Sequence, residues 1–146
     1  MQTMRLPARP DAVAPDGSDV RVLLSVRGGG MAHFELGAGR TSIAVRHRTV
    51  EEVWFFVGGS GQMWRRDEGG EEVTVDVGPG VSIDLPLGTA FQFRSLGTEP
   101  LRAIGATMPP WPGEGEAILT EGPWEPSAPS TRRRSGLADL GDGLRD

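Results

Sequence analysis

Short stretches in which apolar and polar residues alternate, separated by glycine and proline, are the feature that most constrains the fold. In residues 72–77, for example, Val73, Val75 and Val77 lie on one face of an extended chain. No window of about a dozen residues shows the spacing of an amphipathic helix. The 22 glycines and 12 prolines fall between the stretches, as turn residues do in a fold of many short strands. We therefore predict an all-β domain.

The expected strands number nine or ten. They cover residues 20–26, 31–36, 41–48, 52–57, 62–66, 72–77, 81–85, 90–94 and 101–108. The connections are too short for crossover helices, so we expect antiparallel pairing in a barrel or sandwich. The glycine-rich stretch 58–61 predicts a hairpin turn that pairs 52–57 with 62–66.

The composition excludes several classes of function. With a net charge of −5, the chain lacks the positive surface that binds nucleic acid or anionic membranes. It contains no cysteine, which excludes disulfides and thiolate metal sites. No segment is long and apolar enough to span a membrane, and the N-terminus has no secretory pattern, so we expect a cytoplasmic protein.

Proline-rich and polar segments flank the predicted strands. Residues 1–17 predict an extended arm before a barrel over 18–108. Residues 109–126 contain Trp111 and Trp124 among prolines, and we expect this arm to pack on the barrel or on a partner subunit. Residues 127–146, with the basic run at 132–134, predict a disordered tail.

Two motifs in this order resemble those of the cupin superfamily. Residues 47–59, HRTVEEVWFFVGG, are similar to the first cupin motif, and residues 78–89, with Gly-Pro-Gly followed by IDLPLGT, are similar to the second. The resemblance covers about residues 18–108. It implies a double-stranded β-helix, which is a jelly-roll barrel of two facing antiparallel sheets, with a pocket at one mouth. It also implies a homodimer formed through the terminal strands.

The resemblance fails at the positions that usually hold a metal. Cupins commonly bind a metal ion through two histidines and a glutamate in motif one and a third histidine in motif two. Here the first histidine position is Val45, or Arg46 after a shift of one residue, and the position in motif two is Phe91. The asparagine that commonly follows is replaced by Ser95.

Only His47 and Glu52 match the metal ligands of the family. The chain has two histidines, so it cannot supply three imidazoles, and a transition metal needs at least three protein ligands. We therefore predict no metal and no other cofactor. The alternative is a weaker site made by His47, Glu52 and either Gln62 or His33.

Alternation along the strands predicts which side chains face the interior. We expect His47 and Glu52 to act as an acid–base pair within an aromatic pocket. The predicted substrate-binding residues are Val45, Trp54, Gln62, Trp64, Phe91 and Phe93. Each also has a structural interpretation, because the aromatic residues suit a core and His47 suits a buried imidazole hydrogen-bonded to Glu52.

Three functions remain open from the sequence. The first is a metal-independent cupin that binds a small organic molecule and isomerises, epimerises or cyclises it by proton transfer. The second is a non-catalytic binding or sensing module. The third is a metal-dependent oxygenase or lyase with a reduced ligand set. The sequence does not decide whether the protein is an enzyme.

Overall fold

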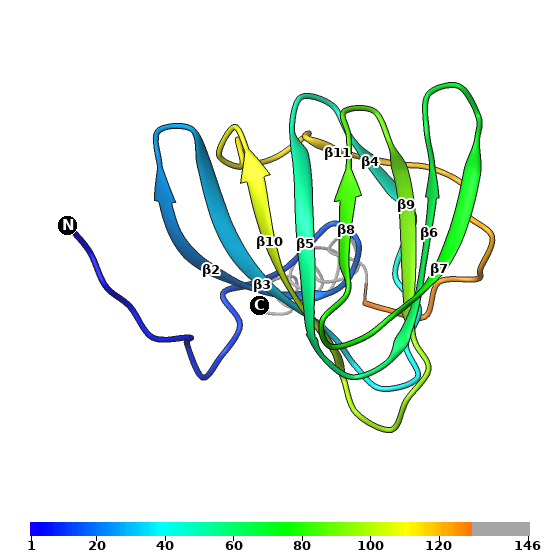
Figure 1. The fold of residues 1–146 in the computed structure, drawn as a ribbon, viewed down its shortest axis with the longest axis horizontal. Coiled ribbons are helices and arrows are strands. Elements are labelled where there is room, and N and C mark those ends of the chain that lie inside the picture. Colours follow the sequence, from blue (N-terminus) through cyan, green and yellow to red (C-terminus); the bar gives the residue numbers. More distant parts are fainter. Residues whose placement is uncertain (130–146) are drawn as a thin grey trace, which may run out of the picture.

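Residues 1–129 of the chain are described by a computed structural model, in which two antiparallel sheets face each other (Figure 1). The six-stranded sheet has the order β1 (Ala12–Val13), β2 (Asp19–Val26), β3 (Gly29–Leu36), β10 (Leu101–Met108), β5 (Glu51–Gly58), β8 (Ser82–Leu85). The five-stranded sheet has the order β11 (Ala117–Leu119), β4 (Val45–His47), β9 (Ala90–Ser95), β6 (Gly61–Arg66), β7 (Glu72–Val77). The all-β prediction is confirmed. The predicted disordered tail lies outside the described residues from residue 130 onward.

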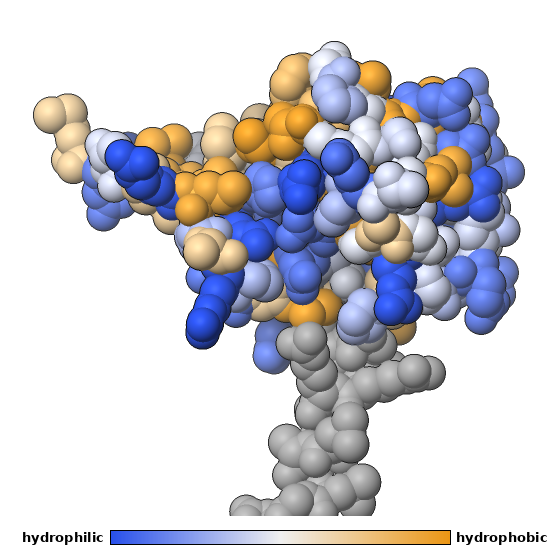
Figure 2. Space-filling view, turned by 90° about the horizontal axis from the view of Figure 1, so that it is seen from below, coloured by the Kyte–Doolittle hydropathy of each residue, from blue (hydrophilic) through white to orange (hydrophobic). Residues whose placement is uncertain are grey.

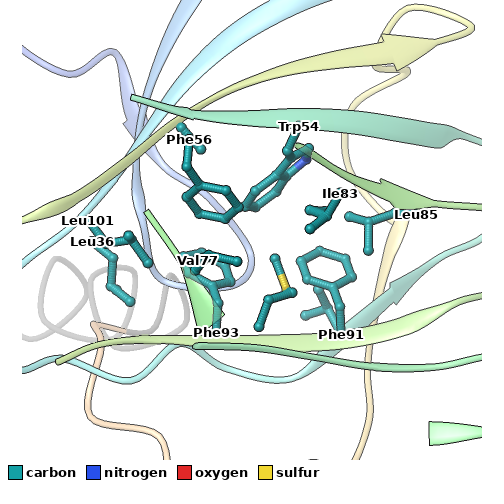
Figure 3. Packing of buried hydrophobic residues seen from close by; sticks show 12 residues of the cluster. Leu36, Trp54, Phe56, Val77, Ile83, Leu85, Phe91, Phe93 and Leu101 are labelled. Carbon is teal, nitrogen blue, oxygen red and sulfur yellow. The ribbon is translucent and has the colours of Figure 1, made fainter. Parts of the chain in front are cut away.

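The core lies between the two sheets and is rich in aromatic side chains (Figure 3). Trp54 and Phe56 of β5 point toward Phe91 and Phe93 of β9. Met63 of β6 belongs to the same core cluster. All five are at most 2% exposed. Every second residue of β5 is buried, which is the period of two that a strand with one buried face requires.

The predicted hairpin between 52–57 and 62–66 is wrong. β5 pairs with β10 and β8, whereas β6 pairs with β7 and β9 in the other sheet. The turn at Gly59 therefore carries the chain from one sheet to the other. A Cβ at Gly59 or Gly61 would collide with the backbone of Pro100 or Arg94, so both glycines permit a close crossing rather than a hairpin.

Two predicted boundaries differ from the structure because of tertiary contacts. The segment 41–48 is a strand only at β4, since the Ile43 amide donates to the Asp16 carbonyl at 2.7 Å instead of continuing the ladder. The short strands β1 and β11 carry no sequence signal of their own. Each pairs with a strand of the barrel, β1 with β2 and β11 with β4.

The N-terminal arm lies against the six-stranded sheet and then turns inward. Arg21 donates to the carbonyls of Pro7 and Ala8 at 2.8 and 3.2 Å, which holds the arm beside β2. After β1, the chain bends so that Asp16 is 5% exposed. The arm therefore belongs in part to the walls of the barrel.

The C-terminal arm covers the outer face of the five-stranded sheet. Gln92 is fully buried there, and its side chain exchanges hydrogen bonds with the backbone N–H and C=O of Trp124 at 3.1 and 2.8 Å. The guanidinium of Arg94 stacks 4.3 Å from the Trp124 ring. In the described residues, the arm thus packs on its own barrel.

Figure 2 shows a surface on which hydrophobic residues lie among hydrophilic ones, with hydrophilic residues predominating on the side away from the N-terminal arm. None of the described residues forms a helix of the length and hydropathy that crossing a membrane requires.

Candidate functional site

A cavity of about 360 Å³ opens between the inner face of the six-stranded sheet, the inward bend of the N-terminal arm and the end of β4. Most of its walls are apolar. The residues that line it are Ala12, Val13, Ala14, Pro15, Asp16, Val20, Val22, Leu23, Ser25, Gly30, Met31, Ala32, Phe34, His47, Glu52, Trp54, Phe91, Thr107, Pro110 and Trp111. The size and the small number of polar groups are typical of a small-molecule site.

Glu52 is the central polar group of the cavity and is 3% exposed. The Trp54 indole N–H donates to its Oε2 at 2.9 Å, and the Thr107 hydroxyl contacts its Oε1 at 3.0 Å. Burial raises the pKa of Glu52 from 4.5 to about 7, despite these two hydrogen bonds, and the nearby Asp16 carboxyl raises it further. Because a hydroxyl can donate or accept, Thr107 can serve either the ionised or the protonated carboxyl.

His47 lies beside Glu52 but does not form the expected hydrogen bond with it. Its Nδ1 is 3.8 Å from Glu52 Oε2, which is beyond hydrogen-bonding distance. Its ring is instead held edge-on between Phe91 and Trp111, with centroid distances of 5.3 and 5.0 Å. Burial lowers the pKa of His47 from 6.5 to about 4, against the opposing charge of Glu116, so the imidazole is neutral near pH 7.

Asp16 brings a second carboxyl to the cavity. Its Oδ1 accepts hydrogen bonds from the Ser18 amide and hydroxyl at 2.9 and 2.6 Å. Burial nevertheless raises its pKa, because these bonds offset only part of the desolvation. The carboxyl is fixed by the same turn, Asp16-Gly17-Ser18, that leads the chain from the arm into β2.

An aromatic stack forms one wall. The rings of Phe34 and Trp54 lie 4.8 Å apart with an angle of 16° between their planes. Gly105 of β10 lies behind the stack, and a Cβ there would come within 2.7 Å of Phe34 and 3.0 Å of Trp54. The missing side chain at Gly105 therefore provides the space in which the stack can form.

Four of the residues predicted from the sequence meet at the cavity, namely His47, Glu52, Trp54 and Phe91. Val45 and Phe93 point into the core behind it and are 1% and 2% exposed. Alternation along β4, β5 and β9 therefore predicted correctly which face of each strand points inward.

Gln62 and Trp64 do not reach the cavity, and their predicted orientation is wrong by one residue. Met63 is the residue of β6 that enters the core. Gln62 contacts Arg94 and Asp76 on the opposite face, and the Trp64 indole donates to Glu72 at 3.0 Å. A slip of one residue exchanges the two faces of a strand.

His33 lies on the outer face of the six-stranded sheet. Its strand neighbours Ala32 and Phe34 line the cavity, so the side chain of His33 points the other way, toward the Arg21 and Glu35 side of the sheet. Its Nδ1 is buried and has no hydrogen-bond partner among residues 1–129.

The side chains at this site do not fit the metal ion that the family resemblance implies. The ring of Phe91 packs against His47 where a third imidazole is expected, and Val45 is buried in the core. Neither Gln62 nor His33 is near enough to replace them. Within residues 1–129, no three His, Cys, Asp or Glu side chains are grouped to hold a metal ion.

Several lining residues were not predicted from the sequence. Asp16 and Trp111 belong to the two arms, and Thr107 and Phe34 belong to strands whose register was not assigned. The alternation of 101–108 and 31–36 could have indicated Thr107 and Phe34. No local signal indicates that Asp16 turns inward.

Comparison with known proteins shows similarity of fold without close similarity of sequence. No family model and no curated protein matches the chain. The capsular polysaccharide assembling protein CapF from Staphylococcus aureus superposes with a TM-score of 0.65 and 18% identity, over 75% of this chain and 33% of CapF. The chain therefore spans about a third of the length of that protein.

Two further matches are shorter proteins. A conserved protein with a double-stranded β-helix domain from Klebsiella pneumoniae superposes with a TM-score of 0.59 and 14% identity, over 75% of this chain and 89% of the Klebsiella chain. The cupin domain of Cnp3 from Schizosaccharomyces pombe gives 0.55 at 12% identity, over 62% of this chain and 64% of its own.

Proposed function

The chain has the double-stranded β-helix fold of the cupin superfamily, and we propose that its cavity binds a small, largely apolar organic molecule and transfers a proton without a metal ion. The observation that carries the proposal is Glu52. It is a buried carboxyl in the wall of a cavity of about 360 Å³, with both oxygens held by Trp54 and Thr107 and a pKa of about 7.

The environments of Glu52 and His47 assign them opposite roles. Near neutral pH, Glu52 exists in both protonated and ionised forms, so it can donate or accept a proton. His47 is neutral at this pH, and a neutral imidazole has one nitrogen that can accept a proton. Such a pair supports an isomerisation, epimerisation or cyclisation in which one group removes a proton and the other returns it.

The cavity volume limits the size of the ligand. At about 30 Å³ for each water molecule in the liquid, the volume corresponds to about a dozen waters. The stack of Phe34 and Trp54 offers a flat apolar surface for a ring or a short chain. We therefore expect a compact ligand with one polar group directed at Glu52.

Binding is tested by thermal shift with a library of small cyclic and aromatic compounds. The matched variant is Ala32→Phe, which fills the cavity from β3 and should abolish every shift while the circular dichroism spectrum is retained. Because Trp54 and Trp111 line the cavity, ligands should also change the tryptophan fluorescence. Hits that bind the wild type and Ala32→Phe equally would contradict a cavity site.

Proton transfer is tested by NMR of bound ligands in D₂O. A ligand with a C–H group beside a carbonyl should gain deuterium at that carbon in the presence of wild-type protein. Glu52→Gln and His47→Gln should slow this exchange at least about 100-fold, while Glu51→Gln, on the opposite and exposed face of β5, should not. Binding without any exchange would contradict the catalytic part of the proposal.

Non-catalytic binding is the second candidate, and one observation favours it. The His47 ring is packed between Phe91 and Trp111, and its Nδ1 lies 3.8 Å from Glu52 Oε2, so the two groups are not joined by the hydrogen bond that a coupled acid–base pair would have. If ligands bind, if Glu52→Gln weakens their binding and if the wild type catalyses no deuterium exchange, the protein is a binding or sensing module.

A further inference from the structure

The part of the cavity wall formed by residues 1–129 contains acidic groups and no basic side chain that could neutralise them. The titratable residues that line it are Asp16, His47 and Glu52, and none of its lining residues in the described part of the chain is arginine. The chain contains no lysine. A ligand that enters therefore meets two carboxyl groups and a neutral imidazole.

Asp16 has an oxygen available to a ligand. Its Oδ1 is occupied by Ser18, whereas its Oδ2 makes no hydrogen bond with any of residues 1–129. The residue is 5% exposed and lines the cavity. Because this oxygen accepts no hydrogen bond from residues 1–129, it is placed at the cavity wall where it can accept one from a ligand.

Asp16 and Glu52 also interact electrostatically across the cavity, since the charge of Asp16 makes Glu52 harder to ionise. Two carboxyl groups in one apolar enclosure repel each other once both are ionised, so they avoid this cost by staying protonated. A positive charge between them is what allows both to ionise.

We propose that the cavity selects an organic cation, an amine with a compact apolar or aromatic body, whose ammonium group contacts Asp16 and Glu52 while its body lies against Phe34 and Trp54. The inference rests on the proposed function, because it names the class of ligand for the same site. The aromatic walls add to the selection, since ring faces attract cations. A carboxylate ligand would face two acids without a counter-charge.

Binding of such a cation has a measurable consequence. Below pH 7, Glu52 is mostly protonated in the free protein. An ammonium group beside it favours the carboxylate, so Glu52 must release its proton to solvent as the ligand enters. A neutral ligand of the same shape causes no such release.

The experiment is isothermal titration calorimetry at pH 6 in two buffers with different ionisation enthalpies. The probes are 2-phenylethylamine, 2-phenylethanol and 3-phenylpropanoate, which share a ring and a chain of similar length but differ in charge. The amine should bind at least about tenfold more tightly than the alcohol, as charge-assisted hydrogen bonds imply, and should release about one proton. The propanoate should bind most weakly.

Asp16→Asn and Glu52→Gln test which groups provide the selection. Each should reduce the preference for the amine over the alcohol at least about fivefold, and Glu52→Gln should abolish most of the proton release. The matched controls, Asp19→Asn at the start of β2 and Glu51→Gln on the exposed face of β5, should behave like the wild type.

The outcomes separate this inference from the proposed function. If the alcohol or the propanoate binds as tightly as the amine, the cation class is wrong while the cavity remains a ligand site. If none of the three binds, the inference is also wrong, and the wider proposal is then decided by the library screen with Ala32→Phe. The cation inference would also be overturned if Asp16→Asn and Glu52→Gln both still bound the amine more tightly than the alcohol, to the same extent as the wild type.

Discussion

Glu52→Gln should stabilise the protein increasingly as the pH rises. In the wild type, the carboxyl is neutral in both the folded and the unfolded state below about pH 4.5. Between pH 4.5 and 7, the unfolded chain loses this proton while the folded chain retains it, so the contribution of Glu52 to the stability of the wild type falls. Glutamine does not titrate, and its amide can still accept from Trp54 and donate to Thr107.

The magnitude follows from the two pKa values. Raising the pKa from 4.5 to about 7, at about 1.4 kcal/mol per pH unit, corresponds to about 3 kcal/mol. Glu52 is 3% exposed, so solvent screening reduces this little. The difference in free energy of unfolding between Glu52→Gln and the wild type should therefore grow by about 3 kcal/mol from pH 4.5 to 7 and then level off.

The assay is urea denaturation from pH 4 to 8, followed by tryptophan fluorescence, with the denaturant slope checked for constancy. Subtracting the wild-type curve cancels the other titrating groups. Glu51→Gln, whose side chain is exposed, supplies the control and should run parallel to the wild type. Parallel curves for Glu52→Gln and the wild type would refute the reasoning, because Glu52 would then ionise as easily in the folded protein as in the unfolded chain.

Three further predictions concern the walls and the arm. His47 has a depressed pKa, so the free energy of unfolding of the wild type relative to that of His47→Gln should fall by about 3 kcal/mol as the pH drops from 6.5 to 4, measured in the same urea series. Gly105→Ala should displace the Phe34–Trp54 stack and cost about 1–3 kcal/mol, visible as a lower midpoint and a changed near-UV circular dichroism spectrum. Gln92→Ala should cost about 2 kcal/mol or more and speed proteolysis of the arm near Trp124, as followed by mass spectrometry.

The pKa values of His47 and Glu52 are shifted in opposite directions, so the pH dependence of wild-type stability alone is a poor test of either shift. Between pH 4.5 and 6.5, ionisation of His47 and of Glu52 change the stability in opposite directions by similar amounts. The two effects should nearly cancel in the wild type. Only the single variants separate them, and each variant should reveal the slope of the residue that remains.

The strands could be predicted from the sequence wherever one face alone is buried. β5 alternates cleanly because its inner residues enter the core and its outer residues, such as Phe55, remain exposed. β6 could not be assigned in this way. The C-terminal arm covers the outer face of its sheet, so Trp64 is buried on that face while Met63 is buried on the inner one. When both faces are covered, alternation no longer distinguishes them.

The sequence predicted that His47 and Glu52 lie side by side at the cavity, which the structure confirms, but the hydrogen bond expected between them is absent. The motif resemblance placed His47 and Glu52 together, and from this the expectation was a hydrogen-bonded imidazole that titrates near pH 7. The structure shows a separation of 3.8 Å, and Glu52 rather than His47 is the group with a pKa near 7. Burial causes both shifts, in a cavity whose walls include Trp111 and residues of the N-terminal arm. Contacts between segments so distant in sequence leave no local pattern.

Apolar side chains occupy the two positions near His47 where the family resemblance implies imidazoles. Val45 and Phe91 stand where the resemblance implies imidazoles, and they supply apolar surface instead of nitrogen donors. A metal ion beside Glu52 would keep its carboxyl ionised, whereas an apolar wall raises its pKa. The described walls of the cavity carry no basic side chain, so a positive charge that ionises Glu52 below pH 7 would arrive with the ligand. Acidity and ligand charge are therefore linked at this site, and an amine that binds there converts Glu52 from a proton donor into a base.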